Sequence, residues 1–181
     1  DSKLVVGLMY MDNYDEAMES VEEVRHSILE ALIDRKINQY INGFNGIVKK
    51  LEKDKFFFII KKENLDSAIE VRFDILEDVK SVNIGNEMSI TLSIGIGYGS
   101  ENLARNYELA RMAMDMALGR GGDQAVVKTE DDIRYFGGKA QTVEKQTRVK
   151  ARVKAHAFRE LLENKDKVII MGHKMLDMDA F

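Results

Sequence analysis

The sequence predicts an α+β fold whose elements follow the order β-α-β-β-α-β-α-β, a ferredoxin-like arrangement with an antiparallel central hairpin. Two patterns of apolar residues and one charged junction between apolar runs support this prediction. Apolar runs with the length of buried strands recur at 4–11, 56–60 and 89–97. Between and after them, apolar residues recur every three or four positions at 14–41, 64–82 and 103–117, which is typical of helices. The charged tip 52–55 joins two apolar runs, which indicates a hairpin.

The first strand, LVVGLMYM at 4–11, ends at a turn signal that begins with Asp12. The helix expected at 14–41 ends at Asn42-Gly43, because glycine after a periodic segment is a common helix stop. Its expected apolar face consists of Val21, Val24, Ile28 and Leu32.

The hairpin is expected to pair residues 47–51 with 56–60. Because FFFII at 56–60 is apolar at every position, we expect that strand to be central and covered on both faces.

In the second half, SITLSIGIG at 89–97 alternates strictly, so Ile90, Leu92, Ile94 and Ile96 should share one face. A helix follows with Leu103, Tyr107, Ala110, Met114 and Ala117 on one side. The glycine-rich segment Gly119–Gly122 ends that helix, and AVVK at 125–128 starts the last strand of the domain.

Composition narrows the classes of function. The chain has 181 residues with a formal net charge of −4, so no overall basic field favours a nucleic acid polymer as partner. It has no cysteine, which excludes disulfides and thiolate metal sites. No apolar run approaches the roughly 20 residues that span a bilayer, so we expect a soluble fragment.

The character of the sequence changes after the Gly137-Gly138 turn, and we place a domain boundary near Gly137. Residues 142–164 predict a basic amphipathic helix, most simply a solvated helix that packs its apolar stripe on its own domain, and 168–171 predict a new strand. The expected organisation is a first domain at 1–136, a linker helix at 137–164 and the edge of a further domain at 165–181.

Two stretches together resemble the GGDEF domain of diguanylate cyclases. These are ITLSIGIGYG at 90–99 and ARMAMDMALGRGGDQAVV at 110–127, in the order and at the spacing of that family. The resemblance implies a metal-binding acid after the first strand, and here Tyr10 stands in its place while the second acid remains as Asp12. In the hairpin, Glu52-Lys53 replace the two glycines, Asp54 keeps the third position, and Lys55 replaces the fourth.

These replacements predict a domain without cyclase activity, because tyrosine is not a hard carboxylate ligand for Mg²⁺. The positions of the family's phosphate-binding Lys and Arg fall on Leu118 and Gly122, and Arg120 is the nearby candidate to replace them.

The stretches GRGGDQ, RYFGGK and MGHKMLDMDA, in this order, resemble the GdpP (YybT) family of cyclic-di-AMP phosphodiesterases. The resemblance implies a membrane anchor and a PAS domain upstream, a DHH/DHHA1 module downstream, and hydrolysis of cyclic di-AMP to pApA at the cytoplasmic face of the membrane. It also implies a homodimer.

At the end of the chain, His173, Asp177 and Asp179 stand at the His-x-x-x-Asp-x-Asp spacing of the first DHH motif. One imidazole and two carboxylates suit Mn²⁺, and the resemblance implies two such ions in the complete module. The alternative interpretation of this stretch is a polar loop after a strand.

Two further hypotheses concern the first domain itself. One is a slow ATPase that uses Asp12 and Asp54 to hold Mg²⁺ with ATP, and it predicts that these carboxylates face one another across adjacent strands. The other is a catalytically inert dimerising spacer that relays a signal.

Overall fold

The structure is a computed structural model that describes residues 4–138. Its strands are β1 (Leu4–Met11), β2 (Ile47–Glu52), β3 (Lys55–Lys61), β4 (Leu92–Gly97), β5 (Gln124–Lys128) and β6 (Ile133–Gly137). Its helices are α1 (Tyr14–Glu19), α2 (Glu23–Gly43), α3 (Lys62–Glu70), α4 (Ile75–Lys80) and α5 (Leu103–Gly119). The predicted α+β class is confirmed.

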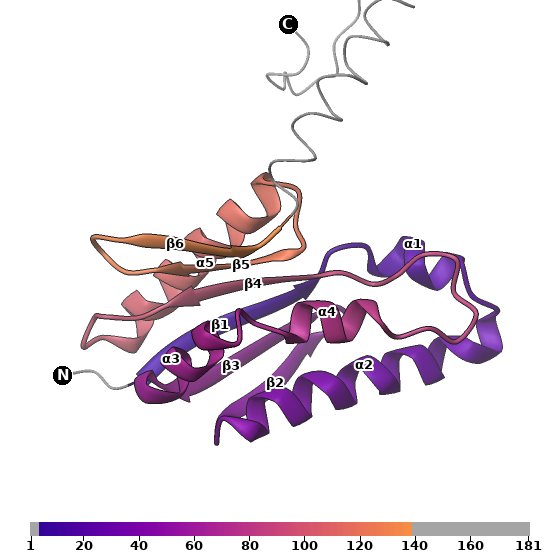
Figure 1. Cartoon of the computed structure of the whole chain (residues 1–181), viewed down its shortest axis with the longest axis horizontal. Coiled ribbons are helices and arrows are strands. Elements are labelled where there is room, and N and C mark those ends of the chain that lie inside the picture. The colour runs from indigo at the N-terminus through magenta and orange to yellow at the C-terminus, as the bar shows by residue number, and fades with distance from the viewer. Residues whose placement is uncertain (1–3, 139–181) are drawn as a thin grey trace, which may run out of the picture. The chain divides into compact units, whose positions relative to one another are not determined.

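The six strands form one sheet in the order β2-β3-β1-β4-β5-β6 (Figure 1). Only the β4–β5 pair is parallel, as a connection through helix α5 requires, and the other pairs are antiparallel. The predicted hairpin is β2–β3: β3 pairs with β1 inside the sheet, and β2 forms an edge. In the β1–β3 register, Tyr10 lies opposite Lys55.

Helices cover the two faces of the sheet unequally. Residues of α1 to α4 pack in the main core against one face, with the predicted set Ile90, Leu92, Ile94 and Ile96 buried among them. Among the described residues, helix α5 is the one helix on the other face, where it packs on β1, β4 and β5. The close approach depends on β4 glycines, since a Cβ at Gly97 would lie 2.1 Å from the Asn106 carbonyl oxygen.

Two predicted single helices are each broken into two. The segment expected as one helix at 14–41 forms α1 and α2 with a break at Ser20–Glu22, and the segment at 64–82 forms α3 and α4. In the second break, Arg72 and Phe73 have φ of 53° and 55°, which no helix accommodates. Phe73 is buried there with its ring 5.3 Å from that of Phe136, so tertiary packing sets the break.

The buried faces of two helices also differ from the prediction. In α2 the buried residues are Leu29, Ile33, Ile37 and Ile41, whereas Val24 and Ile28 are 77% and 52% exposed. In α5, Ala110, Met114 and Ala117 are buried as predicted, while Leu103 and Tyr107 are partly exposed.

The prediction that the FFFII strand is covered on both faces is wrong. Along β3, Phe56, Phe58 and Ile60 are buried in the main core, but Phe57 and Ile59 on the α5 side are only partly buried. Helix α5 lies over the neighbouring strands, so this side of β3 lacks a full cover. The strands buried at every position are β4 and β5.

One strand was not predicted. Residues 133–137 form β6, which pairs with β5 and completes the sheet on the side opposite β2. The basic helix expected at 142–164, the strand expected at 168–171 and the motif residues His173, Asp177 and Asp179 lie outside the described residues. No helix between residues 4 and 138 has both the length and the apolar character to cross a membrane.

Candidate functional site: the end of β1

Asp12 lies directly after β1, where the chain passes between the start of β4 and the turn after α5. Its carboxylate accepts three hydrogen bonds. The Ser93 hydroxyl donates to Oδ1 at 2.5 Å, and the Thr91 hydroxyl and the Asp123 amide donate to Oδ2 at 2.8 and 2.9 Å. Both carboxylate oxygens are therefore engaged by protein donors that join three distant segments of the chain.

The turn after α5 is shaped to reach this carboxylate. Gly122 has φ of +73°, and a Cβ there would lie 2.8 Å from the Asp12 carboxylate. Glycine is therefore required both by the backbone conformation and by the close approach. Asp123 follows with φ of 56° and directs its amide to Asp12.

The Asp123 side chain has a partner of its own. Lys80 of α4 contacts Asp123 Oδ2 at 2.6 Å and also Glu77 at 2.6 Å. Asp123 Oδ1 is buried and has no hydrogen-bond partner among residues 4–138. Burial raises the pKa of the Asp123 carboxyl, and the hydrogen bond from Lys80 opposes that shift.

The β2–β3 hairpin, on the other side of the site, carries lysines. The resemblance to active cyclases implies an acid at the position of Lys55. The Lys55 ammonium lies 2.9 Å from Glu52 and 5.5 Å from the centre of the Tyr10 ring. The hydrogen bond with Glu52 raises the pKa of Lys55. Lys53 pairs with Asp15 at 2.5 Å. A metal ion at this point would meet two positive charges and a phenol ring, which are poor surroundings for Mg²⁺.

Asp12 and Asp54 are predicted to face one another; Asp12 follows β1, and Asp54 lies in the turn between β2 and β3, where its carbonyl accepts a hydrogen bond from the Met11 amide at 2.9 Å. The Asp12 carboxylate is directed to Thr91, Ser93 and Asp123. Among residues 4–138, no three acidic or histidine side chains gather closely enough to hold a metal ion.

Arg120, the third predicted site residue of this domain, follows α5. Its Nε donates to Gln124 Oε1 at 3.1 Å, and its guanidinium lies 4.4 Å from the centre of the Tyr135 ring. These contacts hold it against β5 and β6.

Sequence reasoning missed the partners of Asp12. The sequence places Thr91 and Ser93 in a strand that resembles the cyclase family, and Asp123 in a glycine turn. It gives none of the three a contact with Asp12. Thr91 and Ser93 are 79 and 81 residues from Asp12 in sequence, and Asp123 is 111 residues away. The available signal was the Thr-x-Ser spacing, which places two hydroxyls on one face of a strand.

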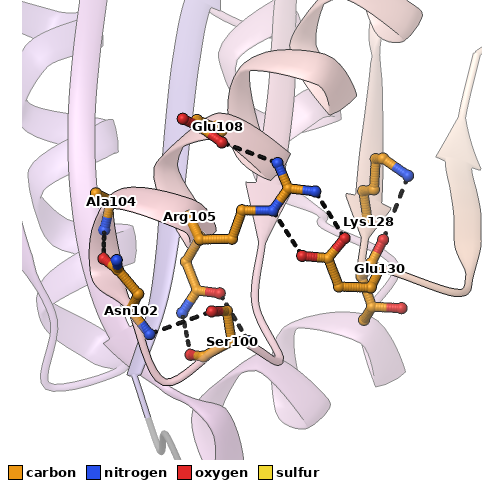
Figure 2. Close-up of polar contacts among 9 residues, drawn as sticks. Ser100, Asn102, Ala104, Arg105, Glu108, Lys128 and Glu130 are labelled. Atoms are coloured by element: carbon orange, nitrogen blue, oxygen red, sulfur yellow. Dashed lines mark hydrogen bonds and ion pairs between the residues drawn. The ribbon is translucent and has the colours of Figure 1, made fainter.

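A second polar cluster lies at the start of α5, where Asn102 caps the helix by accepting from the Ala104 amide (Figure 2). Arg105 makes two hydrogen bonds to Glu130, at 2.6 and 2.7 Å, and one to Glu108 at 2.8 Å. The bonds with Glu130 raise the pKa of Arg105 and lower that of Glu130. Arg105 therefore has carboxylate partners on both sides, although it borders a shallow hollow of about 270 Å³ on α5.

The sheet order and the arrangement of the helices define a GGDEF-type α+β domain. The chain matches, over residues 9–135, the family described as "Cyclic-di-AMP phosphodiesterase GdpP-like, GGDEF domain". It belongs to that family.

Comparison with curated relatives supports this family assignment. The chain is 38% identical over 179 residues to the cyclic-di-AMP phosphodiesterase GdpP of Geobacillus thermodenitrificans, and 37% identical over 180 residues to the cyclic-di-AMP phosphodiesterase PdeA of Listeria monocytogenes. These alignments cover 98% and 99% of this chain but 27% of each relative. The chain thus spans little more than a quarter of the length of these relatives.

Solved structures support the fold. A diguanylate cyclase/phosphodiesterase from Caldicellulosiruptor saccharolyticus superposes with a TM-score of 0.59 at 20% identity, covering 73% of this chain and 80% of that one. The GGDEF domain of DgcB from Caulobacter crescentus superposes with a TM-score of 0.58 at 14% identity, covering 71% and 78%. At these identities the likeness concerns the fold alone.

Proposed function

We propose that this chain is the regulatory, non-catalytic GGDEF-type domain of a cyclic-di-AMP phosphodiesterase. The observation that supports it is the alignment of almost the whole chain with about a quarter of proteins named for that activity. The Asp12 carboxylate and the hairpin lysines support the same proposal, because that carboxylate already accepts from three protein donors and the lysines place positive charge on the hairpin.

The hydrolytic chemistry is assigned to a DHH module that the chain enters at its C-terminal end. His173, Asp177 and Asp179 are proposed as its first metal ligands. Imidazole and carboxylate ligands fit Mn²⁺, and a two-metal centre supplies Lewis acidity for in-line cleavage of a phosphodiester. The proposed substrate is cyclic di-AMP and the product pApA. The proposed site of action is the cytoplasmic face of the membrane, through an anchor upstream of this sequence.

The experiment compares this chain with a version extended through the complete module. The extended protein should hydrolyse cyclic di-AMP with Mn²⁺, and residues 1–181 alone should not, because three ligands do not hold two metals. In the extended protein, Asp177→Ala and Asp179→Ala should each nearly abolish hydrolysis. Asp54→Ala is the matched control, since it removes a carboxylate from the GGDEF-type domain and should leave hydrolysis intact. Full hydrolysis by either Asp177→Ala or Asp179→Ala would contradict the assignment.

The same proposal expects no nucleotide chemistry from the GGDEF-type domain. Incubation of residues 1–181 with GTP and either Mg²⁺ or Mn²⁺ should yield no cyclic dinucleotide. The slow ATPase hypothesis gains no support from the described residues, because Asp12 serves three protein donors. Phosphate release from ATP that is lost in Asp54→Asn, with the fold retained, would revive it.

A further inference from the structure

The last described residues, Gly137 and Gly138, lie beside the turn that follows α5. In the β5–β6 register, Gly137 lies opposite Gln124. A Cβ at Gly137 would lie 3.6 Å from the Asp123 carbonyl oxygen, and a Cβ at Gly138 would lie 3.3 Å from Gln124 Cβ. We call Gly137-Gly138 the exit segment, because the chain continues from it into residues 139–181. The exit segment and the turn are therefore in direct contact.

The turn, residues 121–124, depends on side-chain contacts for its conformation. Gly121, Gly122 and Asp123 have φ of 99°, 73° and 56°, a left-handed conformation that costs free energy in a residue with a Cβ. The Asp12 carboxylate accepts from the Asp123 amide at 2.9 Å, and the buried Gln124 side chain donates to the Gly122 carbonyl at 3.0 Å. Loss of the Asp12 acceptor removes one of these contacts, so we expect the turn to relax to a different backbone conformation.

Helix α4 contacts both the turn and the exit segment from the side of the main core. Lys80 pairs with Asp123 Oδ2 at 2.6 Å. A Cβ at Gly137 would lie 2.9 Å from Leu76 Cδ1, so the Leu76 side chain packs on the exit segment itself. A displacement of the turn therefore alters the contacts that α4 makes with the exit segment.

We propose that the hydrogen bond between Asp12 and the Asp123 amide fixes the exit segment, and that its loss changes the rate at which the downstream module hydrolyses cyclic di-AMP. The inference rests on the proposed function, in which this chain is a regulatory domain. Two contacts join Asp12 to the exit segment: the hydrogen bond to Asp123, and the packing of residues 123–124 on Gly137 and Gly138. These contacts form a continuous set of hydrogen bonds and packed atoms, the physical basis of coupling between two places in a fold.

The first test measures hydrogen exchange on residues 1–181. In Asp12→Ala, the amides of residues 121–128 and 133–138 should exchange at least about tenfold faster than in the wild type, while those of α2 should keep their rates. Asn106→Ala is the matched control. Asn106 is fully buried, its side chain bonds to Ser100 and Leu4, and it lies about 20 Å from the turn along α5.

Asn106→Ala also removes buried hydrogen bonds, so it destabilises the same domain without touching the turn. Its amides at 121–128 and 133–138 should exchange no faster than those of α2 relative to the wild type. The same pattern of exchange in Asp12→Ala and Asn106→Ala would overturn the proposal, because the loss of Asp12 would then act only through overall stability.

The second test uses the protein extended through the complete module and measures hydrolysis of cyclic di-AMP with Mn²⁺. Asp12→Ala should change kcat by about threefold or more, and Asn106→Ala should not. Lys80→Met removes the ion pair with Asp123 from a partly exposed position, so it should fold like the wild type and change kcat in the same direction as Asp12→Ala. Circular dichroism confirms that each variant is folded at the temperature of the assay.

The outcomes separate this inference from the proposed function. An active wild-type protein whose kcat is unchanged by Asp12→Ala and Lys80→Met would overturn the inference and leave the proposed function standing. A change of kcat in Asn106→Ala equal to that in Asp12→Ala would overturn the inference as well, because it would assign the effect to stability alone. A wild-type extended protein without hydrolysis would overturn the proposed function and the inference together.

Discussion

The two sides of the end of β1 differ in how their charged groups are held. On the β4 side, the Asp12 carboxylate accepts from two hydroxyls and an amide, and Ser93, one of the donors, is fully buried. On the hairpin side, Lys53 and Lys55 pair with carboxylates at the surface. A carboxylate that holds three segments together is costly to replace, whereas a surface ion pair contributes little. The difference indicates that Asp12 has a structural role in the fold, whereas the hairpin charges do not.

The strongest test of this comparison is Asp12→Ala. It leaves the Ser93 hydroxyl and the Asp123 amide without an acceptor, and we expect the free energy of unfolding to fall by about 2–4 kcal/mol. Asp54→Ala, on the hairpin turn, should change it by no more than about 0.5 kcal/mol. Urea denaturation of both variants measures the difference. Equal effects would show that the Asp12 network does not hold the fold together.

Much of the framework was predictable because its signals are local. The buried face of β4 and the end of β1 at Asp12 follow from the alternation and length of apolar runs in the sequence. The break between α3 and α4 was not predictable, because Arg72 and Phe73 are not residues that usually take a positive φ. The contact between Phe73 and Phe136 of β6 holds that conformation, and the sequence patterns do not predict β6.

The same limit applies to the site. The resemblance to the GGDEF family singles out Asp12, but the donors that define its role lie 79 to 111 residues away in the sequence. The spacing of Val24 and Ile28 correctly predicts a helix. It wrongly predicts that these two residues face the core, since both are exposed. A helix with apolar residues on two sides leaves the choice of buried face to the tertiary fold.

A smaller effect on the free energy of unfolding is expected from substitution of Asp123, whose amide contacts Asp12. Burial raises the pKa of its carboxyl, so the folded state binds a proton more tightly than the unfolded state. The contribution of this group to stability is full below its unfolded pKa and is lost as the pH rises through the folded pKa. Asp123→Asn removes this dependence, and asparagine tolerates the positive φ at this position.

The measurement for Asp123→Asn is urea denaturation at about pH 7 and at about pH 4, the latter close to the pKa of an aspartate in an unfolded chain. The stability of the variant relative to the wild type should be greater at the higher pH. The reverse order would mean that the ion pair with Lys80, at 2.6 Å, outweighs the cost of burial.

The smallest effect on the free energy of unfolding is expected from substitution of Lys55. The Lys55→Met variant keeps an apolar stem beside the Tyr10 ring and removes the ion pair with Glu52. Because hydrogen bonding to Glu52 raises the pKa of Lys55, the contribution of the pair is fully present at neutral pH and is lost only as the pH rises through that pKa. Water and salt screen the pair, so the unfolding curve of Lys55→Met at neutral pH should superimpose on that of the wild type.

Lys55→Glu sharpens the same test, because it places a carboxylate beside Glu52 and Asp54. Repulsion should lower the urea midpoint slightly at low salt, and about 0.5 M salt, where the screening length falls to a few ångströms, should remove the difference. A deficit that persists in high salt would mean that Lys55 is held by buried contacts. The hairpin side would then resemble the Asp12 side, and the contrast between the two would fail.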